Sequence, residues 1–199
     1  MNKDKKIINK ELFLPIVNNM KSKNYDKAIN LLNQLLDQNQ DEDIINKLKA
    51  SVYLKKKDWK KSLSCYEKIK NKENSFEIVN NIGVALYNLG RLLEASIKFE
   101  KSLHLNNSYL PAYENLISTY VLLGKYDLSV KFIIQSLKLD PNNRKITSSL
   151  IDIFNYHEPK EIGNSIINAN HRINKLNLLI KSNNIIKDST LQKILRESE

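Results

Sequence analysis

Apolar residues recur at helical spacing through the middle of the chain. Between residues 76 and 91, Val79, Ile82 and Leu86 fall three or four positions apart, so one stripe of a helix is apolar. Gly90 follows, and glycine readily takes the left-handed backbone conformation that ends a helix in a short turn. A second apolar stripe begins after this turn. The pattern predicts two antiparallel helices of about 14 residues, joined as a hairpin.

The same pattern occurs twice in succession, in the blocks 76–109 and 110–143. The blocks align residue by residue, with Gly90 on Gly124 and Asn81 on Asn115. A fixed period of this length is typical of an array of stacked helical hairpins. A single hairpin cannot bury both of its apolar stripes, so stacking on its neighbours completes the core.

The period extends toward the N-terminus, where small residues mark it best. Close packing of the second helix of each hairpin requires a small side chain, and Ala28, Ser62, Ala95 and Ser129 recur at intervals of 33 or 34 residues. A bulky set, Leu32, Tyr66, Phe99 and Ile133, has the same spacing. These positions predict four repeats, at about 9–42, 43–75, 76–109 and 110–143, and three are enough for a stable stack.

These residues resemble the tetratricopeptide repeat, which favours bulky, small and aromatic residues at fixed positions. The third block supplies Val79, Ile82, Gly83, Leu86, Ala95, Phe99 and Ser102, and the fourth supplies Tyr113, Leu116, Tyr120, Ser129, Ile133, Ser136 and Pro141. Ile117 departs from the pattern where a small residue is usual, so we expect its two helices to lie slightly further apart. The resemblance implies an all-α fold, a right-handed superhelical α-solenoid of stacked helix-turn-helix repeats.

The two ends of the chain follow the pattern less well. The first repeat has Pro15 inside its first helix, as suits a repeat that caps the stack. After the fourth repeat, Ile146 and Leu150 mark a capping helix over 144–157. We therefore expect an array over 1–157 and a helical C-terminal extension over 158–199, whose role the sequence does not indicate.

Composition narrows the class of protein. The chain has 199 residues, 41% of them hydrophobic, with few glycines and prolines, which favours helices over a sheet. One cysteine is typical of a reducing compartment, and no apolar run has the roughly 20 residues of a membrane span. The N-terminal apolar run is too short for a signal sequence. We expect a cytoplasmic protein without a membrane segment.

The formal charge of +10 raises the question of nucleic acid, and its distribution bears on the answer. Residues 1–75 hold 17 basic and 10 acidic side chains, whereas residues 76–143 hold 6 of each. The densest group is Lys55, Lys56, Lys57, Lys60 and Lys61, around a predicted turn. A helical-repeat RNA reader would repeat its contacts along the concave face, so we favour a solvated turn and keep an acidic partner or RNA as alternatives.

Nothing in the sequence indicates catalysis. His104, His157 and His171 lie far apart in the pattern and lack the i, i+4 spacing of a zinc site. Cys65 has no histidine placed beside it, and the chain lacks a phosphate-binding glycine loop. We predict no catalytic residue, no metal site and no cofactor.

The resemblance directs attention to Asn81 and Asn115, which occupy the sixth position of their first helices. In this family that position faces the inside of the superhelix, and asparagine ladders there hold extended peptides in O-linked N-acetylglucosamine transferases. An amide offers both a donor and an acceptor to a peptide backbone. The predicted peptide-binding concave surface comprises Asn80, Asn81, Tyr87, Asn88, Glu114, Asn115 and Ser118.

A second subtype of the family clamps the C-terminal carboxylate of a chaperone with lysine, asparagine and arginine. Lys47 and Asn81 fit that clamp, but Ser51, Pro111 and Asn115 stand at its other positions, which argues against it. We therefore predict a non-catalytic scaffold that binds a protein or peptide segment. Two alternatives stay open, a segment associated with a glycosyltransferase or oxygenase module and an RNA-binding array. The sequence indicates neither the partner nor the oligomeric state.

Overall fold

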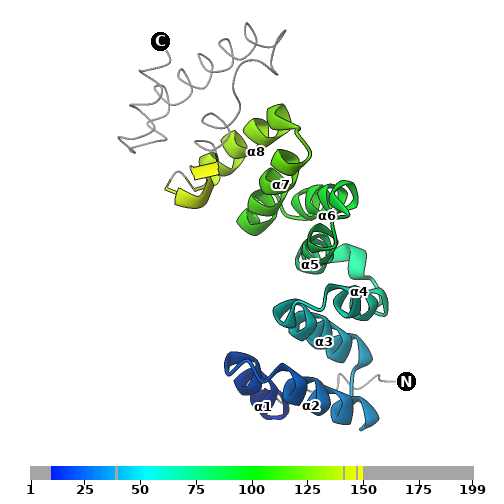
Figure 1. The fold of residues 1–199 in the computed structure, drawn as a ribbon. Helices are drawn as coiled ribbons and strands as arrows, with labels where there is room; N and C mark the ends of the chain where they lie inside the picture. The colour runs from blue at the N-terminus through cyan, green and yellow to red at the C-terminus, as the bar shows by residue number, and fades with distance from the viewer. Residues whose placement is uncertain (1–9, 39, 141, 147, 150–199) are drawn as a thin grey trace, which may run out of the picture. The chain divides into compact units, whose positions relative to one another are not determined.

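The structure is a computed structural model that describes residues 10–149 apart from 39, 141 and 147 (Figure 1). Within these residues the chain is helical and contains no strand. The elements are α1 (Lys10–Lys21), α2 (Tyr25–Asp37), α3 (Glu42–Lys56), α4 (Trp59–Glu67), the 3₁₀ turn η1 (Lys72–Asn74), α5 (Phe76–Asn88), α6 (Leu92–Leu105), α7 (Leu110–Leu122) and α8 (Tyr126–Leu139). We call α1, α3, α5 and α7 the A helices, and α2, α4, α6 and α8 the B helices.

The described residues fall into two compact units, divided between Glu94 and Ala95 within α6. In the first unit α1 packs on α2 and α3 packs on α4, as two antiparallel hairpins (Figure 1). The helices α2 and α4 also pack on the A helix that follows each of them. In the second unit α7 packs on α8. This order of alternating contacts is that of stacked hairpins.

The periodic positions form the core, as the sequence predicts. The small set Ala28, Ser62, Ala95 and Ser129 is 0% exposed at every member. The bulky set Leu32, Tyr66, Phe99 and Ile133 is also 0% exposed throughout. The B helices therefore bury the same two positions in every repeat, which confirms the period of 33 or 34 residues as a packing period.

Two of the small residues also fasten their hairpins with a hydrogen bond. The Ser62 hydroxyl donates to the Ala50 carbonyl at 3.0 Å, and the Ser129 hydroxyl donates to the Ile117 carbonyl at 3.3 Å. Both bonds join a B helix to its own A helix over the same sequence separation. The acceptor of the second bond belongs to Ile117, the isoleucine that stands where a small residue is usual.

Each turn between an A and a B helix contains one residue in the left-handed conformation. These residues are Lys23 (φ 59°), Lys57 (φ 63°), Gly90 (φ 76°) and Gly124 (φ 68°). The predicted role of the two glycines is confirmed. In the first two repeats a lysine adopts a conformation in which a Cβ atom is unfavourable.

We expect exchanges at these turns to shift stability in opposite directions. Gly90→Ala should lower the free energy of unfolding by about 1 kcal/mol, because a Cβ atom penalises the left-handed backbone. A Cβ atom at Gly90 would meet nothing within 4 Å, so backbone strain alone is measured. Lys57→Gly should raise stability by up to about 1 kcal/mol for the converse reason. Urea denaturation of both variants checks this pair, and a loss of stability in Lys57→Gly would contradict it.

The described part of the chain ends inside the predicted capping helix. Residues 144–146, 148 and 149 are helical, and Ile146 is 1% exposed. The backbone N–H of Ile146 donates to the Asn143 side chain at 3.2 Å, as at a helix N-terminus. The rest of the predicted 144–157 helix and the predicted extension over 158–199 lie outside the described residues. None of the described helices is long and apolar enough to cross a membrane.

Candidate functional site

Four of the residues predicted to contact a peptide lie on α5. Asn81 is half-buried and accepts a hydrogen bond from the Asn80 amide at 3.5 Å. Asn80 itself is only 3% exposed, which leaves almost no surface for a partner. Tyr87 is half-buried, and the exposed Asn88 donates to the Val84 carbonyl of its own helix at 2.8 Å. We therefore leave Asn80 out of the proposed contact surface.

The other three predicted residues lie on α7, in the second unit. Asn115 is half-buried, and the Ser118 hydroxyl donates to the Glu114 carbonyl at 2.9 Å. The Glu114 carboxylate accepts from Lys145 at 2.6 Å and from Asn143 at 3.5 Å. Glu114 is thus held by groups of its own chain, an arrangement that the repeat pattern does not predict.

Asn81 and Asn115 occupy equivalent positions in their repeats. Each is the sixth residue of its A helix, in α5 and α7 respectively. Their flanking core residues, Ile82 and Leu116, are 7% and 0% exposed. Both amides therefore lie beside the buried stripe and not within it, which is the position that a surface contact requires.

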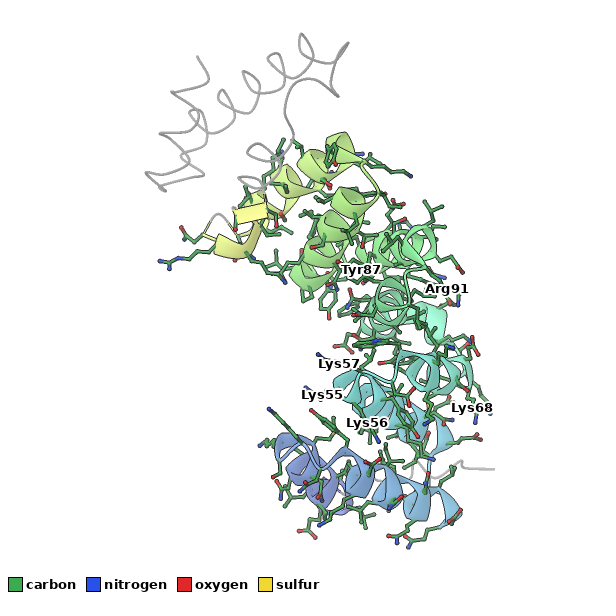
Figure 2. All side chains as sticks on the ribbon, viewed as in Figure 1. Lys55, Lys56, Lys57, Lys68, Tyr87 and Arg91 are labelled. Carbon is green, nitrogen blue, oxygen red and sulfur yellow. The ribbon has the colours of Figure 1, made fainter. Side chains whose placement is uncertain are left out.

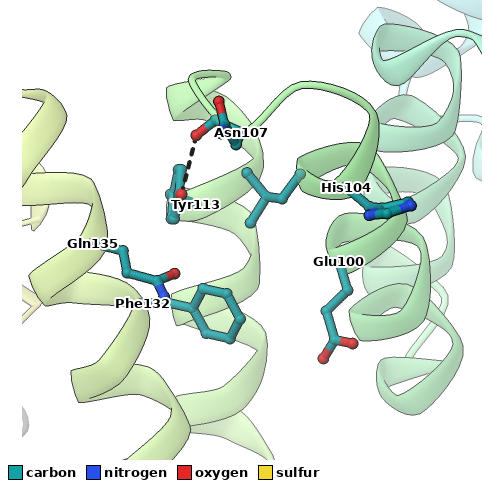
Figure 3. Close-up of a pocket in the computed structure, with 7 residues that line it drawn as sticks. Glu100, His104, Asn107, Tyr113, Phe132 and Gln135 are labelled. Atoms are coloured by element: carbon teal, nitrogen blue, oxygen red, sulfur yellow. Dashed lines mark hydrogen bonds between the residues drawn. The ribbon is translucent and has the colours of Figure 1, made fainter.

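Sequence reasoning missed a pocket in the second unit, between α6, α7 and α8 (Figure 3). It has a volume of about 430 Å³ and is lined by Glu100, Leu103, His104, Asn107, Tyr113, Phe132 and Gln135. Glu100 and His104 project from α6 on one side, and Phe132 and Gln135 project from α8 on the other (Figure 3). No sequence signal could have found it, because its residues come from three helices and share no motif.

Aromatic rings form one wall of this pocket and join α7 to α8. The Phe132 ring centroid lies 6.2 Å from that of Tyr113 and 5.9 Å from that of Tyr120, with Phe132 and Tyr120 stacked. The Tyr113 hydroxyl donates to the Asn107 carbonyl at 3.1 Å (Figure 3). The Tyr120 hydroxyl donates to the Glu100 carboxylate, which joins α7 to α6. These contacts tie the rings to α6 and to the loop before α7.

The two phenols make the second unit sensitive to alkaline pH. Burial raises the pKa of Tyr113, and burial together with the hydrogen bond to Glu100 raises the pKa of Tyr120. In the unfolded chain a tyrosine ionises near its ordinary pKa of about 10. The unfolded state therefore loses these protons first, so stability is fully present below that pH and falls as the pH rises above it.

We expect Tyr120→Phe to show this effect directly. At neutral pH the variant should lose about 1 kcal/mol of stability, because it lacks the hydrogen bond to Glu100. Above about pH 10 its stability should fall less steeply than that of the wild type, because one raised pKa is gone. Urea midpoints measured across the alkaline range check both parts. Parallel curves for the two proteins would contradict the assignment.

The lysine cluster singled out from the sequence lies at the turn between α3 and α4. Lys56 forms an ion pair with Asp26 of α2, and Lys61 forms one with Asp58 at 3.0 Å. Asp58 also caps α4 by accepting from the Lys61 backbone N–H at 3.2 Å. The hydrogen bond from Lys61 lowers the pKa of Asp58, and the Lys61 Nζ atom lies 5.7 Å from the centroid of the Tyr53 ring.

The candidates for catalysis and metal binding do not come together in the described residues. Cys65 is 9% exposed, and burial raises the pKa of its thiol. The described part of the chain holds no group of three or more His, Cys, Asp and Glu side chains suited to a metal ion. His104 is exposed at the pocket, whereas His157 and His171 lie outside the described residues.

Comparison with known protein families matches one of the repeats. Residues 110–143, the bounds of the fourth predicted repeat, match the tetratricopeptide repeat family. No curated protein matches the chain by sequence.

Solved structures show the same fold. A crystal structure of MamA is similar with a TM-score of 0.60, 16% identity and coverage of 66% of this chain and 78% of that one. MamA from Desulfovibrio magneticus RS-1, residue 41 to its end, is similar with a TM-score of 0.62 and 15% identity. The match covers 67% of this chain and 76% of that one. The first tetratricopeptide domain of Spaghetti (RPAP3), bound to the HSP90 peptide SRMEEVD, is similar with a TM-score of 0.53 and 25% identity. The match covers 56% of this chain and 90% of that one.

Proposed function

Because the chain contains a tetratricopeptide repeat and has the fold of proteins built from such repeats, we propose that it is a non-catalytic scaffold for another protein. The segment bound is a peptide or an extended stretch of a partner, and the A helices α5 and α7 contact it. The observation that carries this proposal is the shared register of the half-buried Asn81 and Asn115 beside the core stripe. The peptide complex of the Spaghetti domain, which is 25% identical, supports the kind of ligand.

The chemistry of the two amides fits a peptide backbone. Each asparagine offers a donor and an acceptor, which matches the N–H and C=O groups of an extended chain without demanding a sequence. Each such bond contributes about 1 kcal/mol net, so neighbouring contacts must add to them. Tyr87, Asn88 and Ser118 are the further contacts that we propose on the same two helices. Association with a catalytic module and RNA binding stay predictions of lower rank.

A double substitution tests the proposal. Peptides selected from a display library on the wild-type chain serve as probes, and their binding is measured by fluorescence anisotropy. Asn81→Ala with Asn115→Ala should weaken binding about 30-fold, because two amide contacts of about 1 kcal/mol each are lost. The far-ultraviolet circular dichroism should stay unchanged, since neither residue is in the buried stripe.

A matched control comes from a B helix. Asn30 and Asn33 are exposed on α2, so Asn30→Ala with Asn33→Ala removes two amides that the proposal does not use. This control should bind like the wild type. Equal binding by the Asn81 and Asn115 variant, or equal losses in both double variants, would show that the A-helix asparagines do not contact the ligand.

A further inference from the structure

The first two turns between A and B helices carry lysines at equivalent positions. Lys21, Lys23 and Lys27 stand at the turn between α1 and α2, and Lys55, Lys57 and Lys61 stand 34 residues later at the turn between α3 and α4. Lys56 and Lys60 add to the second group. We call these eight residues the basic edge. The second group is the densest cluster of lysines in the sequence, and the equivalent turn of the first repeat carries a matching group.

The ion pair between Lys56 and Asp26 holds the two turns beside each other, because Lys56 ends α3 and Asp26 lies in the first turn of α2. Figure 2 shows Lys55, Lys56 and Lys57 together at one end of α3, with Lys68 on the other side of the hairpin. The two groups therefore form one continuous charged edge within the first unit.

Most of this charge has no paired acid among the described residues of the unit. Asp26 and Asp58 are the acids of the two turns, and each is already paired, with Lys56 and Lys61 respectively. Six lysines remain exposed, and among the described residues none of them has an acidic partner: Lys21, Lys23, Lys27, Lys55, Lys57 and Lys60. Clustered charges of one sign create a potential that attracts anions.

Local helix preferences account for only some of these lysines. Cations suit the last turn of a helix, which explains Lys21 and Lys55, but they are unfavourable in the first turn. Lys27 and Lys60 nevertheless lie in the first turns of α2 and α4. Lys23 and Lys57 occupy left-handed positions that favour glycine. Residues that break local rules together are expected at functional sites.

We propose that the basic edge binds an acidic segment of the protein partner, a stretch rich in glutamate and aspartate. This inference rests on the proposed function and names the chemistry of the partner. The edge adjoins the C-terminal ends of α1 and α3, which belong to the A-helix series. The lysines recur in two successive repeats, and such a row suits an extended segment with several negative charges.

The basic edge lacks the side chains with which proteins recognise nucleic-acid bases or insert into membranes. Base recognition and stacking use arginine forks and exposed aromatic faces. Arg91, at the next turn, is engaged by Glu94 at 2.6 and 2.7 Å, and the aromatic rings Tyr25, Tyr53 and Trp59 are half-buried. Insertion into a membrane uses apolar side chains. The exposed apolar residues of the described first unit lie outside the two turns, at Leu12, Leu14, Val17 and Leu93.

Fluorescence anisotropy with the full chain tests this proposal, with a labelled peptide of alternating glutamate and serine as the probe. The variant K23Q/K55Q/K57Q/K60Q should bind the probe about tenfold more weakly, because exposed ion pairs each contribute little and four are removed. The same four lysines changed to arginine should keep the affinity. Added salt should weaken binding to the wild type, since exposed charges are screened.

A control of equal charge uses lysines outside the edge. Lys68, Lys70, Lys131 and Lys138 are exposed, and K68Q/K70Q/K131Q/K138Q should bind the probe like the wild type. If both quadruple variants lost the same affinity for the probe, binding would depend on net charge and not on the basic edge, which would overturn the proposal. The edge could also bind polyuridylate RNA or phosphatidylserine vesicles through the same lysines. If it bound either of them more tightly than the peptide, the proposal that its ligand is an acidic segment would be wrong. If the wild type did not bind the probe, the proposal about the basic edge would be wrong. The A-helix proposal would stand, because it rests on Asn81 and Asn115.

Discussion

Phe99→Ala should lower the free energy of unfolding by about 3–5 kcal/mol. Phe99 is 0% exposed on α6, at a position whose equivalents Leu32, Tyr66 and Ile133 are equally buried. Truncation removes the ring from the core and leaves a cavity that the fixed helices can fill only in part. Since small proteins have about 5–15 kcal/mol of stability in all, this one change removes a large fraction of it.

Urea denaturation followed by far-ultraviolet circular dichroism measures the effect, and the same helix supplies its control. Ile97 is 63% exposed, so Ile97→Ala should change stability by no more than about 0.5 kcal/mol. If Phe99→Ala cost as little as Ile97→Ala, the periodic position would not be a core position.

Ser62→Leu should be the second most damaging change, at about 2–4 kcal/mol. Ser62 is 0% exposed, and its hydroxyl donates to the Ala50 carbonyl at 3.0 Å. Leucine removes that hydrogen bond and adds volume at a fully buried position where the B helix packs on its A helix. Overpacking of this kind forces side chains out of favoured rotamers or moves the backbone.

Two further variants separate volume from hydrogen bonding. Ser62→Ala removes only the bond and should cost about 1 kcal/mol. Ser64 is exposed on the same helix, so Ser64→Leu tests leucine without burial and should be nearly neutral. Thermal or urea unfolding of the three variants gives the order. If Ser62→Leu were as stable as Ser62→Ala, the close approach of the helices at this position would be disproved.

The sequence predicts the repeating part of this fold well because each repeat meets the same local requirements. Small residues at the helix crossing, a bulky residue beside them and a left-handed turn residue all follow from short-range geometry. Even Lys57, which stands where glycine is usual, adopts the left-handed conformation. Lys23 and Lys57 thus share the backbone conformation that glycine favours at Gly90 and Gly124.

Features that join different repeats could not be predicted in this way. The aromatic pocket depends on Glu100, Tyr113 and Phe132 meeting from three helices, and no single-helix pattern encodes that meeting. The pairing of Glu114 with Lys145 is another contact across elements. The burial of Asn80 shows the same limit, since one step along the helix separates it from the half-buried Asn81.

Site-specific photo-cross-linking tests the central claim, that A helices contact the partner, most directly. A benzophenone amino acid is placed at position 81 in one variant and at the exposed position 97 of α6 in another. Each variant is irradiated with a peptide selected on the wild-type chain. We predict strong cross-linking from position 81 and only background from position 97. Cross-linking from position 97 with none from position 81 would contradict binding through the A helices.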